Sequence, residues 1–308
     1  METLRDIGEH EAIRRILSQL GTHKDLAVGA GDDCAVCHIS GTGDDQVLTT
    51  DPVIANVHFL MSDDPHRIGN KAAGRVLSDI AAMGAQPQWL LVNVVAPQDL
   101  DFQVLDGIYQ GMSKLCNRFG ATIIGGDLSK GCNLELHVFG TGVLPSDSAL
   151  LRSGARPGDV VFVTGALGNS RAGKHLDFIP RVAEGLYLRK SGVVTAMMDI
   201  SDGLATDLRH MLKQSGVGAV LDAEAIPKFG TVEQALYDGE DFELLFTVPP
   251  DCMDALCAEW MEHFDAELYR IGQIDGETEV LKLCLSSGER RVLECKAFEH
   301  FSGLQEPG

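Results

Sequence analysis

Two series of apolar segments, separated by one polar stretch, constrain the fold of this chain more than any other feature. The stretch 145–158 is rich in Ser, Gly, Pro and Arg and lies between two strand-like runs, as a linker does. Strand-like and helix-like runs alternate before it, and both kinds of run occur again after it. The pattern predicts an α/β (α+β) protein with an N-terminal α/β domain over 1–145 and a C-terminal α+β domain over 151–308.

Hydrophobic periodicity predicts the individual elements. Ile68, Ala72, Val76 and Ile80 fall on one face of a helix over 66–83. Further helices are expected over 104–119 and 204–211, and strands over 47–51, 90–95, 121–124, 134–138, 160–164 and 243–248.

The charge of the chain narrows the class of partner. Asp and Glu outnumber Lys and Arg by 45 to 25, which gives a formal net charge of −20. Nucleic acids and anionic membranes bind basic faces, so we expect neither as a partner. No run approaches the ~20 apolar residues that cross a bilayer, and residues 1–10 lack the apolar core of a signal peptide, so the sequence predicts a cytoplasmic protein. An acidic chain that binds a nucleotide needs a cation between the two, and Mg²⁺ suits that role.

Aspartates lie beside predicted turns or inside the first long helix at six places along the chain. Any one of them is most often a helix cap or a turn residue. Asp79 differs, because it lies between Leu77 and Ile80 in an apolar helical pattern, where an unpaired carboxylate is costly. Carboxylates that converge in one pocket are hard oxygen ligands typical of Mg²⁺. The aspartates at these places are Asp32, Asp33, Asp51, Asp79, Asp127, Asp199, Asp202 and Asp241.

The segment 168–175, GNSRAGKH, nearly matches the phosphate-binding P-loop pattern GxxxxGK[ST]. Its last residue is His175, so the hydroxyl that would hold Mg²⁺ is missing. We therefore interpret the segment as a Gly-rich strand-to-helix turn and leave open whether a phosphate lies near it.

Seven stretches of the sequence form a specific set when they are taken together. They are 31–35 (GDDCA), 49–51 (TTD) with 57–59 (VHF), 71–85 (Lys71, then LSDIAAMGA), 125–127 (GGD), 152–159 (RSGARPGD), 199–204 (DISDGL) and 239–246 (GEDFELLF). In content and order, the set resembles the thiamine-monophosphate kinase family. That family belongs to the superfamily of aminoimidazole-ribonucleotide synthetase and selenophosphate synthetase.

The resemblance implies a fold, a reaction and partners. The fold is the two-domain synthetase-like fold, whose N-terminal domain binds ATP and Mg²⁺ and dimerises through its sheet. The reaction is direct in-line transfer of the γ-phosphoryl group of ATP to thiamine monophosphate, with several Mg²⁺ ions and no phospho-enzyme. The implied partners are ATP, thiamine monophosphate and a second copy of the chain.

The resemblance also implies site residues, position by position. Asp51, Asp79, Asp127 and Asp202 are the expected catalytic residues. The Mg²⁺ ligands are expected at Asp33, Thr49, Thr50, Asp51, Asp79, Asp127, Asp199 and Asp202. The ATP contacts are expected at Tyr109, Gly126, Asp127, Arg152 and Ser201, and the thiamine monophosphate contacts at His58, Glu240 and Phe298, with Phe301 as the alternative to Phe298.

The sequence departs from the family pattern at three places, none of which removes an expected ligand. Residues 128–130 read LSK where the family usually has two Thr and an Arg, Asp238 replaces a Gly, and the segment 173–199 is shorter than usual. Relatives of other function remain as alternatives. They are hydrogenase-maturation proteins (which carry a C-terminal Cys that 303–308 lacks), the two synthetases, and a member that binds thiamine phosphates without turnover.

Overall fold

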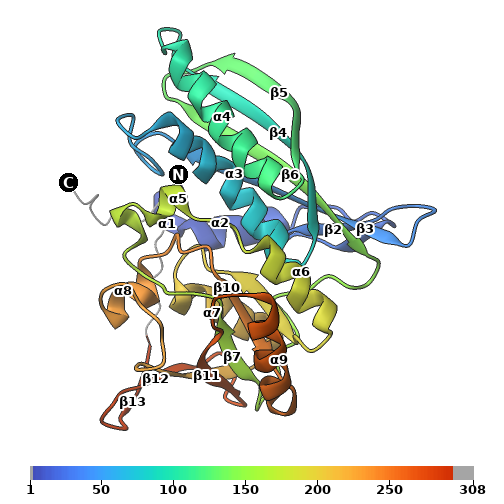
Figure 1. The fold of residues 1–308 in the computed structure, drawn as a ribbon, viewed down its shortest axis with the longest axis vertical. Helices are drawn as coiled ribbons and strands as arrows, with labels where there is room; N and C mark the ends of the chain where they lie inside the picture. Colours follow the sequence, from blue (N-terminus) through green and yellow to red (C-terminus); the bar gives the residue numbers. More distant parts are fainter. Residues whose placement is uncertain (1–2, 294–308) are drawn as a thin grey trace.

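Two β-sheets, one from each half of the chain, organise the fold (Figure 1). The structure is a computed structural model that describes residues 3–293. Within these residues the first sheet has the strand order β1-β2-β3-β6-β4-β5, and the second has the order β13-β12-β9-β11-β7-β10-β8. Neighbouring strands pair antiparallel except β4 with β5 and β9 with β12. This mixture of helices and sheets confirms the predicted α/β (α+β) class.

Two long helices cover one face of the first sheet. Asp64 and Asp101 cap their N-termini by accepting hydrogen bonds from the backbone two residues later. The helices cross very closely, because a Cβ atom at Gly69 or Gly111 would lie 2.0 Å from a backbone oxygen of the other helix. The elements are β1 (Leu26–Val28), β2 (Ala35–His38), β3 (Asp44–Ile54), α3 (Pro65–Ala82), β4 (Gln86–Ala96), α4 (Phe102–Arg118), β5 (Thr122–Lys130) and β6 (Glu135–Pro145). The helices expected over 66–83 and 104–119 are therefore confirmed.

The opposite face of the first sheet carries no helix among the described residues, and we call it the open face. In β4 the residues alternate between buried ones and the exposed Trp89, Leu91 and Asn93. Trp89 is 47% exposed, Leu91 39% and Ile124 of β5 57%. This leaves large apolar side chains in solvent on one side of the sheet.

The edge strand β5 differs from its prediction. A buried strand was expected over 121–124, with Gly125, Gly126 and Asp127 after it. In the structure β5 runs on to Lys130 in parallel with β4, and a bulge opposite Leu90 and Leu91 absorbs the extra residue. As an edge strand it is largely exposed, and Asp127 lies inside it.

The second sheet is covered on both faces. Helices α7 and α8 pack on one face over residues such as Leu221 and Leu245, while α6 and α9 pack on the other over Phe162 and Phe246. The strands expected over 160–164 and 243–248 and the helix over 204–211 are confirmed. The elements are β7 (Val160–Val163), η1 (Ser170–Ala172), α5 (Lys174–Asp177), α6 (Val182–Ser191), β8 (Ala196–Asp199), α7 (Leu204–Ser215), β9 (Gly218–Asp222), α8 (Val232–Tyr237), β10 (Leu244–Val248), α9 (Pro250–His263), β11 (Tyr269–Asp275), β12 (Leu281–Cys284) and β13 (Arg290–Val292).

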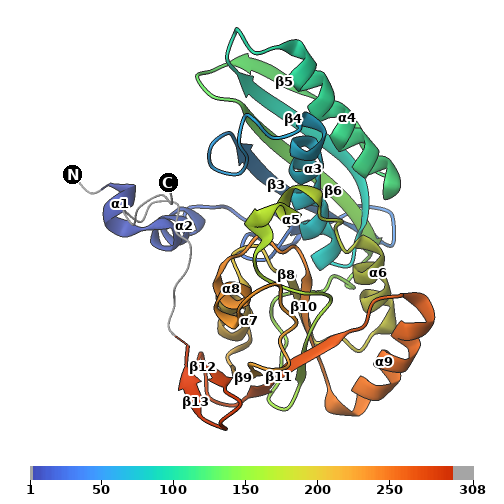
Figure 2. The same ribbon diagram turned by 60° about the vertical axis from the view of Figure 1, so that its left-hand side comes forward.

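Two short helices precede both sheets. They are α1 (Leu4–Ile7) and α2 (Glu9–Leu17), and they stand away from the rest of the molecule in Figure 2. None of the helices within residues 3–293 combines the length and apolar character that crossing a membrane requires.

Candidate active site

One face of α3 carries four polar side chains between the two halves of the molecule. They are Lys71, Arg75, Ser78 and Asp79, and their spacing of four, three and one residues keeps them on one side of the helix. Lys71 and Ser78 are fully buried. We call this set the polar stripe. A helix buries such groups only when other segments supply partners for them.

Each member of the polar stripe bonds a side chain that comes from outside α3. The Oγ of Ser78 donates to Asp199 at 2.5 Å, and Asp79 accepts from the Thr49 hydroxyl at 2.6 Å. Arg75 donates to Asp51 at 2.8 Å, and the Lys71 ammonium lies 2.6 Å from the Glu240 carboxylate. The stripe thus joins β3 of the first sheet to the end of β8 and to the loop before β10 in the second half.

Four of the expected Mg²⁺ ligands gather around the stripe, and we call them the acid cluster. They are Asp33, Asp51, Asp79 and Asp199, whereas Asp202 is exposed in the loop that follows Asp199. Burial, followed by the nearby charges of Asp51, Asp199 and Asp33, raises the pKa of Asp79 well above its usual value. Burial likewise raises the pKa of Asp33 to about 8 and that of Asp199 to about 6. The folded chain therefore holds several carboxylates where their negative charges are poorly compensated.

The donor set fits a hard divalent cation. The Oδ2 atom of Asp33 is buried and has no hydrogen-bond partner within residues 3–293, so it is an acceptor with no donor there. Among the described residues, no three His, Cys, Asp or Glu side chains enclose one ion as they stand. Mg²⁺ in phosphate sites takes one or two carboxylates and completes its shell with water and phosphate oxygens, so such a triad is not required.

Arg152 and Ser201, two expected ATP contacts, border the acid cluster. The Arg152 guanidinium bonds Asp33, with Nε at 2.9 Å from Oδ1. The backbone amides of Ser201 and Asp202 both donate to Asp207 at 3.0 Å. Sequence reasoning missed Asp207, although its place in the first turn of α7 is typical of a carboxylate that accepts from the preceding loop.

Glu240, an expected substrate contact, lies at the other end of the stripe. Its carboxylate lies 2.6 Å from Lys71, 3.4 Å from His175 and 3.7 Å from Arg75. Burial alone would raise the pKa of Glu240, but these cations lower it below its usual value. The buried His58, also an expected substrate contact, presents its backbone oxygen to Lys71 at 2.6 Å.

The loop that carries Glu240 has a strained backbone. Glu240 and Phe242 have φ values of 57° and 52°, a backbone region that residues other than Gly rarely adopt. The neighbouring Gly239, at 70°, adopts it without strain. The Phe242 ring stacks on Phe178 at 4.0 Å between ring centroids, and the Glu240 amide donates to the Ser201 oxygen at 2.7 Å. Such strain costs about 1–3 kcal/mol per residue and is typical of loops that fix a functional side chain.

The Gly-rich segment 168–175 does not form a P-loop. The Gly168 amide donates to Asp241 at 2.9 Å, and the Asn169 amide donates to Asp238 at 2.9 Å. Carboxylates of the protein thus occupy backbone donors that a P-loop would offer to phosphate. Asp238, one of the departures from the family pattern, anchors this turn.

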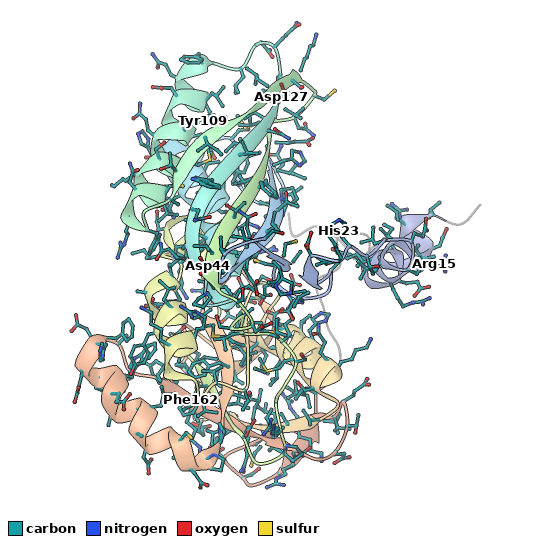
Figure 3. The ribbon with its side chains drawn as sticks, turned by 90° about the vertical axis from the view of Figure 1, so that its right-hand side faces the viewer. Arg15, His23, Asp44, Tyr109, Asp127 and Phe162 are labelled. Atoms are coloured by element: carbon teal, nitrogen blue, oxygen red, sulfur yellow. The ribbon has the colours of Figure 1, made fainter. Side chains whose placement is uncertain are left out.

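The structure separates four expected residues from the acid cluster within one chain. Side chains alternate along β3, so Thr50 points to the open face while Thr49 and Asp51 point to α3. Asp127 pairs with Asn93 of β4, so it lies on the open face and is separated from β3 by β4 and β6. Figure 3 shows Tyr109 and Asp127 at the end of the first half that is furthest from the second sheet. Gly126 lies beside Asp127, and Phe298 and Phe301 lie outside the described residues.

Comparison with known proteins identifies the family. Two family models described as AIR synthase related protein match residues 31–144 (N-terminal domain) and 156–282 (C-terminal domain). Thiamine-monophosphate kinases from Salmonella typhimurium and Rhodopirellula baltica are 33% and 35% identical, over 96% and 87% of this chain and 98% and 89% of those proteins.

Solved structures agree with this result. The structure described as "AaThiL complexed with AMPPCP and TMP" has a TM-score of 0.81 and 29% identity, covering 97% of this chain and 99% of that one. Hydrogenase maturation protein HypE in complex with ATP, at 22% identity and a TM-score of 0.70, shares the fold. The predicted resemblance and synthetase-like fold are confirmed. The chain belongs to the AIR synthase related family and, within it, to the thiamine-monophosphate kinases.

Proposed function

We propose that this chain transfers the γ-phosphoryl group of ATP to thiamine monophosphate, which gives ADP and thiamine diphosphate. The observation that carries the proposal is the polar stripe of α3, which joins a buried acid cluster at one end to Glu240 at the other. The chain also matches thiamine-monophosphate kinases over nearly its whole length.

The reaction needs positioning and charge neutralisation more than a protein nucleophile. A phosphate oxygen of thiamine monophosphate forms a bond to the γ-phosphorus while the bond from that phosphorus to ADP breaks. The acceptor phosphate, with a second pKa of about 6, is largely ionised at neutral pH, so no strong general base is required. Glu240 and His58 are then the thiamine monophosphate contacts, and Arg152 and Ser201 are the ATP contacts.

We infer that the acid cluster holds Mg²⁺. Asp33, Asp51, Asp79 and Asp199 would be its protein ligands there, and Asp202 would add a ligand from the neighbouring loop. Thr49 would orient Asp79 through their 2.6 Å hydrogen bond. Bound there, Mg²⁺ would neutralise phosphate charge and allow two polyanions to approach each other. The raised pKa values of the buried Asp33 and Asp199 support this assignment, since a cation removes the cost of holding their charges together.

We also propose that two copies of the chain pair through the open face. Trp89, Leu91 and Ile124 expose apolar surface there, which a second copy would cover. Asp127 lies on the same face and so would be part of the interface. A site completed across the dimer accounts for Asp127 and Gly126, which the family pattern assigns to ATP and which lie apart from the acid cluster of a single chain. Tyr109 lies on α4, on the opposite side of the sheet, so this pairing does not account for it.

A coupled ADP-release assay tests the proposed function. We expect Mg²⁺-dependent ADP release with thiamine monophosphate, and none with free thiamine or with an aminoimidazole precursor. EDTA should abolish the activity and added Mg²⁺ should restore it. ADP release that does not depend on thiamine monophosphate would contradict the proposed substrate, and full turnover in EDTA would contradict the proposed role of Mg²⁺.

A further inference from the structure

Two cations of the polar stripe contact Glu240, and they differ in how many donors they have left. The Lys71 ammonium has three N–H groups, and all three have partners. They bond the Glu240 carboxylate at 2.6 Å, the His58 oxygen at 2.6 Å and the His175 Nδ1 atom at 2.8 Å. Lys71 therefore has no hydrogen-bond donor left for a ligand.

Arg75 is in the opposite situation. Its guanidinium has five N–H groups, and within the described part of the chain only one of those at Nη2 makes a hydrogen bond, to Asp51 at 2.8 Å. Nη1 lies 3.7 Å from Glu240, which is an ion pair beyond hydrogen-bond distance. Nε is buried and has no partner among residues 3–293. Buried donors without acceptors are rare in folded proteins, so this group points to a ligand that supplies acceptors.

The position of Arg75 indicates which ligand that is. On one side the guanidinium touches Asp51 of the acid cluster, where the proposed function places Mg²⁺ and ATP. On the other side it faces Glu240, where the proposed function places thiamine monophosphate. The Phe242 ring lies 5.9 Å from the guanidinium carbon, and this aromatic face helps to hold the planar group in place.

We propose that Arg75 is a further catalytic residue, whose guanidinium binds the acceptor phosphate of thiamine monophosphate through its unused donors. This inference rests on the proposed function and adds a residue that the sequence pattern did not assign. The acid cluster would repel an approaching phosphate, and a fixed cation at this point offsets that repulsion. As a phosphate oxygen of the substrate bonds to the γ-phosphorus and ADP leaves, the same contact stabilises the negative charge shared by the two groups.

Arg75→Gln tests the proposal, with Arg118→Gln as the matched control on the exposed surface of α4. A charge-assisted contact to phosphate supports a loss of about 10- to 100-fold. We expect that loss in kcat/KM for thiamine monophosphate, while the KM for ATP and the Mg²⁺ concentration for half activity change by no more than about twofold. Guanidinium ion added to Arg75→Ala should restore part of the lost turnover. Arg118→Gln should match the unsubstituted protein.

Two outcomes would overturn the proposal. Unchanged kinetics in Arg75→Gln would mean that Arg75 does not contact the substrate. A loss confined to the Mg²⁺ requirement and the KM for ATP, without rescue by guanidinium, would mean that Arg75 only holds Asp51.

Arg75→Lys provides a second test if Arg75→Gln does not fold, since lysine keeps the charge but loses the planar fork. We expect a smaller loss of about tenfold, again specific to thiamine monophosphate, and unchanged kinetics would overturn the proposal. Turnover of the unsubstituted chain with thiamine monophosphate, measured in parallel, separates a failure of this inference from a failure of the proposed function.

Discussion

Asp199→Asn should make the metal-free protein more stable while it abolishes activity. Asp199 is buried and accepts a hydrogen bond from Ser78, and asparagine keeps both the shape and the acceptor. What the substitution removes is a negative charge that the fold holds at a cost. A carboxylate that is buried at such a cost is typical of a site whose ligand compensates the charge.

The magnitude follows from the pKa of this group. Burial raises the pKa of Asp199 from 3.8 to about 6, which at about 1.4 kcal/mol per pKa unit corresponds to about 3 kcal/mol. Because the folded-state pKa is the higher one, the folded chain binds more protons than the unfolded chain between pH 4 and pH 6. Stability is therefore lost as the pH rises through that window, and the full penalty is present above pH 6.

Thermal unfolding in EDTA and in Mg²⁺, from pH 4.5 to pH 8, measures the effect. In EDTA above pH 6, Asp199→Asn should melt roughly 5–10 °C higher than the unsubstituted chain, and the difference should shrink towards pH 4.5. Mg²⁺ should stabilise the unsubstituted chain more than the variant. Asp99→Asn, at an exposed position, is the control and should change nothing. A destabilised variant in EDTA at neutral pH, or one with normal turnover, would refute the reasoning.

Three further outcomes are expected. Lys71→Met leaves Glu240, whose side chain is 15% exposed, without its nearest cation and should destabilise the protein by about 3–5 kcal/mol in urea unfolding. Glu240→Gln added to it should recover part of that loss, whereas simple additivity would count against the pairing. Glu240→Ala should chiefly raise the KM for thiamine monophosphate in steady-state kinetics, and a change confined to ATP would show that the ligand is wrongly assigned. Trp89→Glu places a charge on the open face and should shift the protein from dimer to monomer in light scattering, so an unchanged mass would exclude that face as the interface.

The long helices could be predicted from the sequence because their apolar residues repeat at helical spacing. The pattern of Ile68, Ala72, Val76 and Ile80 locates α3 to within a residue of its ends. Strand ends were harder to predict. Strand β6 extends to Pro145 through Gly140 and Gly142, which have no side chains and so show no pattern of alternation. Glycine is needed there because α3 packs directly over the strand, and a Cβ atom at Gly140 would lie 2.2 Å from Val76.

The site was harder to derive than the fold. Spacing along the chain does not show that Asp33, Asp79 and Asp199 meet, since that depends on how the two sheets pack. Only the resemblance to the family predicted that these three residues share one site. Alternation of side chains along a strand is enough by itself to separate Thr50 from Thr49. Helical spacing likewise puts Arg75 on the same face as Asp79, but a pattern of acidic residues alone leaves out the cations beside them.

Several buried polar pairs join the two halves of the chain, and they have a consequence for its cooperativity. Ser78 with Asp199 and Lys71 with Glu240 each take one side chain from either side of the stretch 145–158, and Arg152 within that stretch bonds Asp33 of the first half. Were one half to unfold alone, charges on the other would lose partners that water does not fully replace. The two sheets, although each has its own core, are thereby coupled into one thermodynamic unit, and heating should melt them in a single transition.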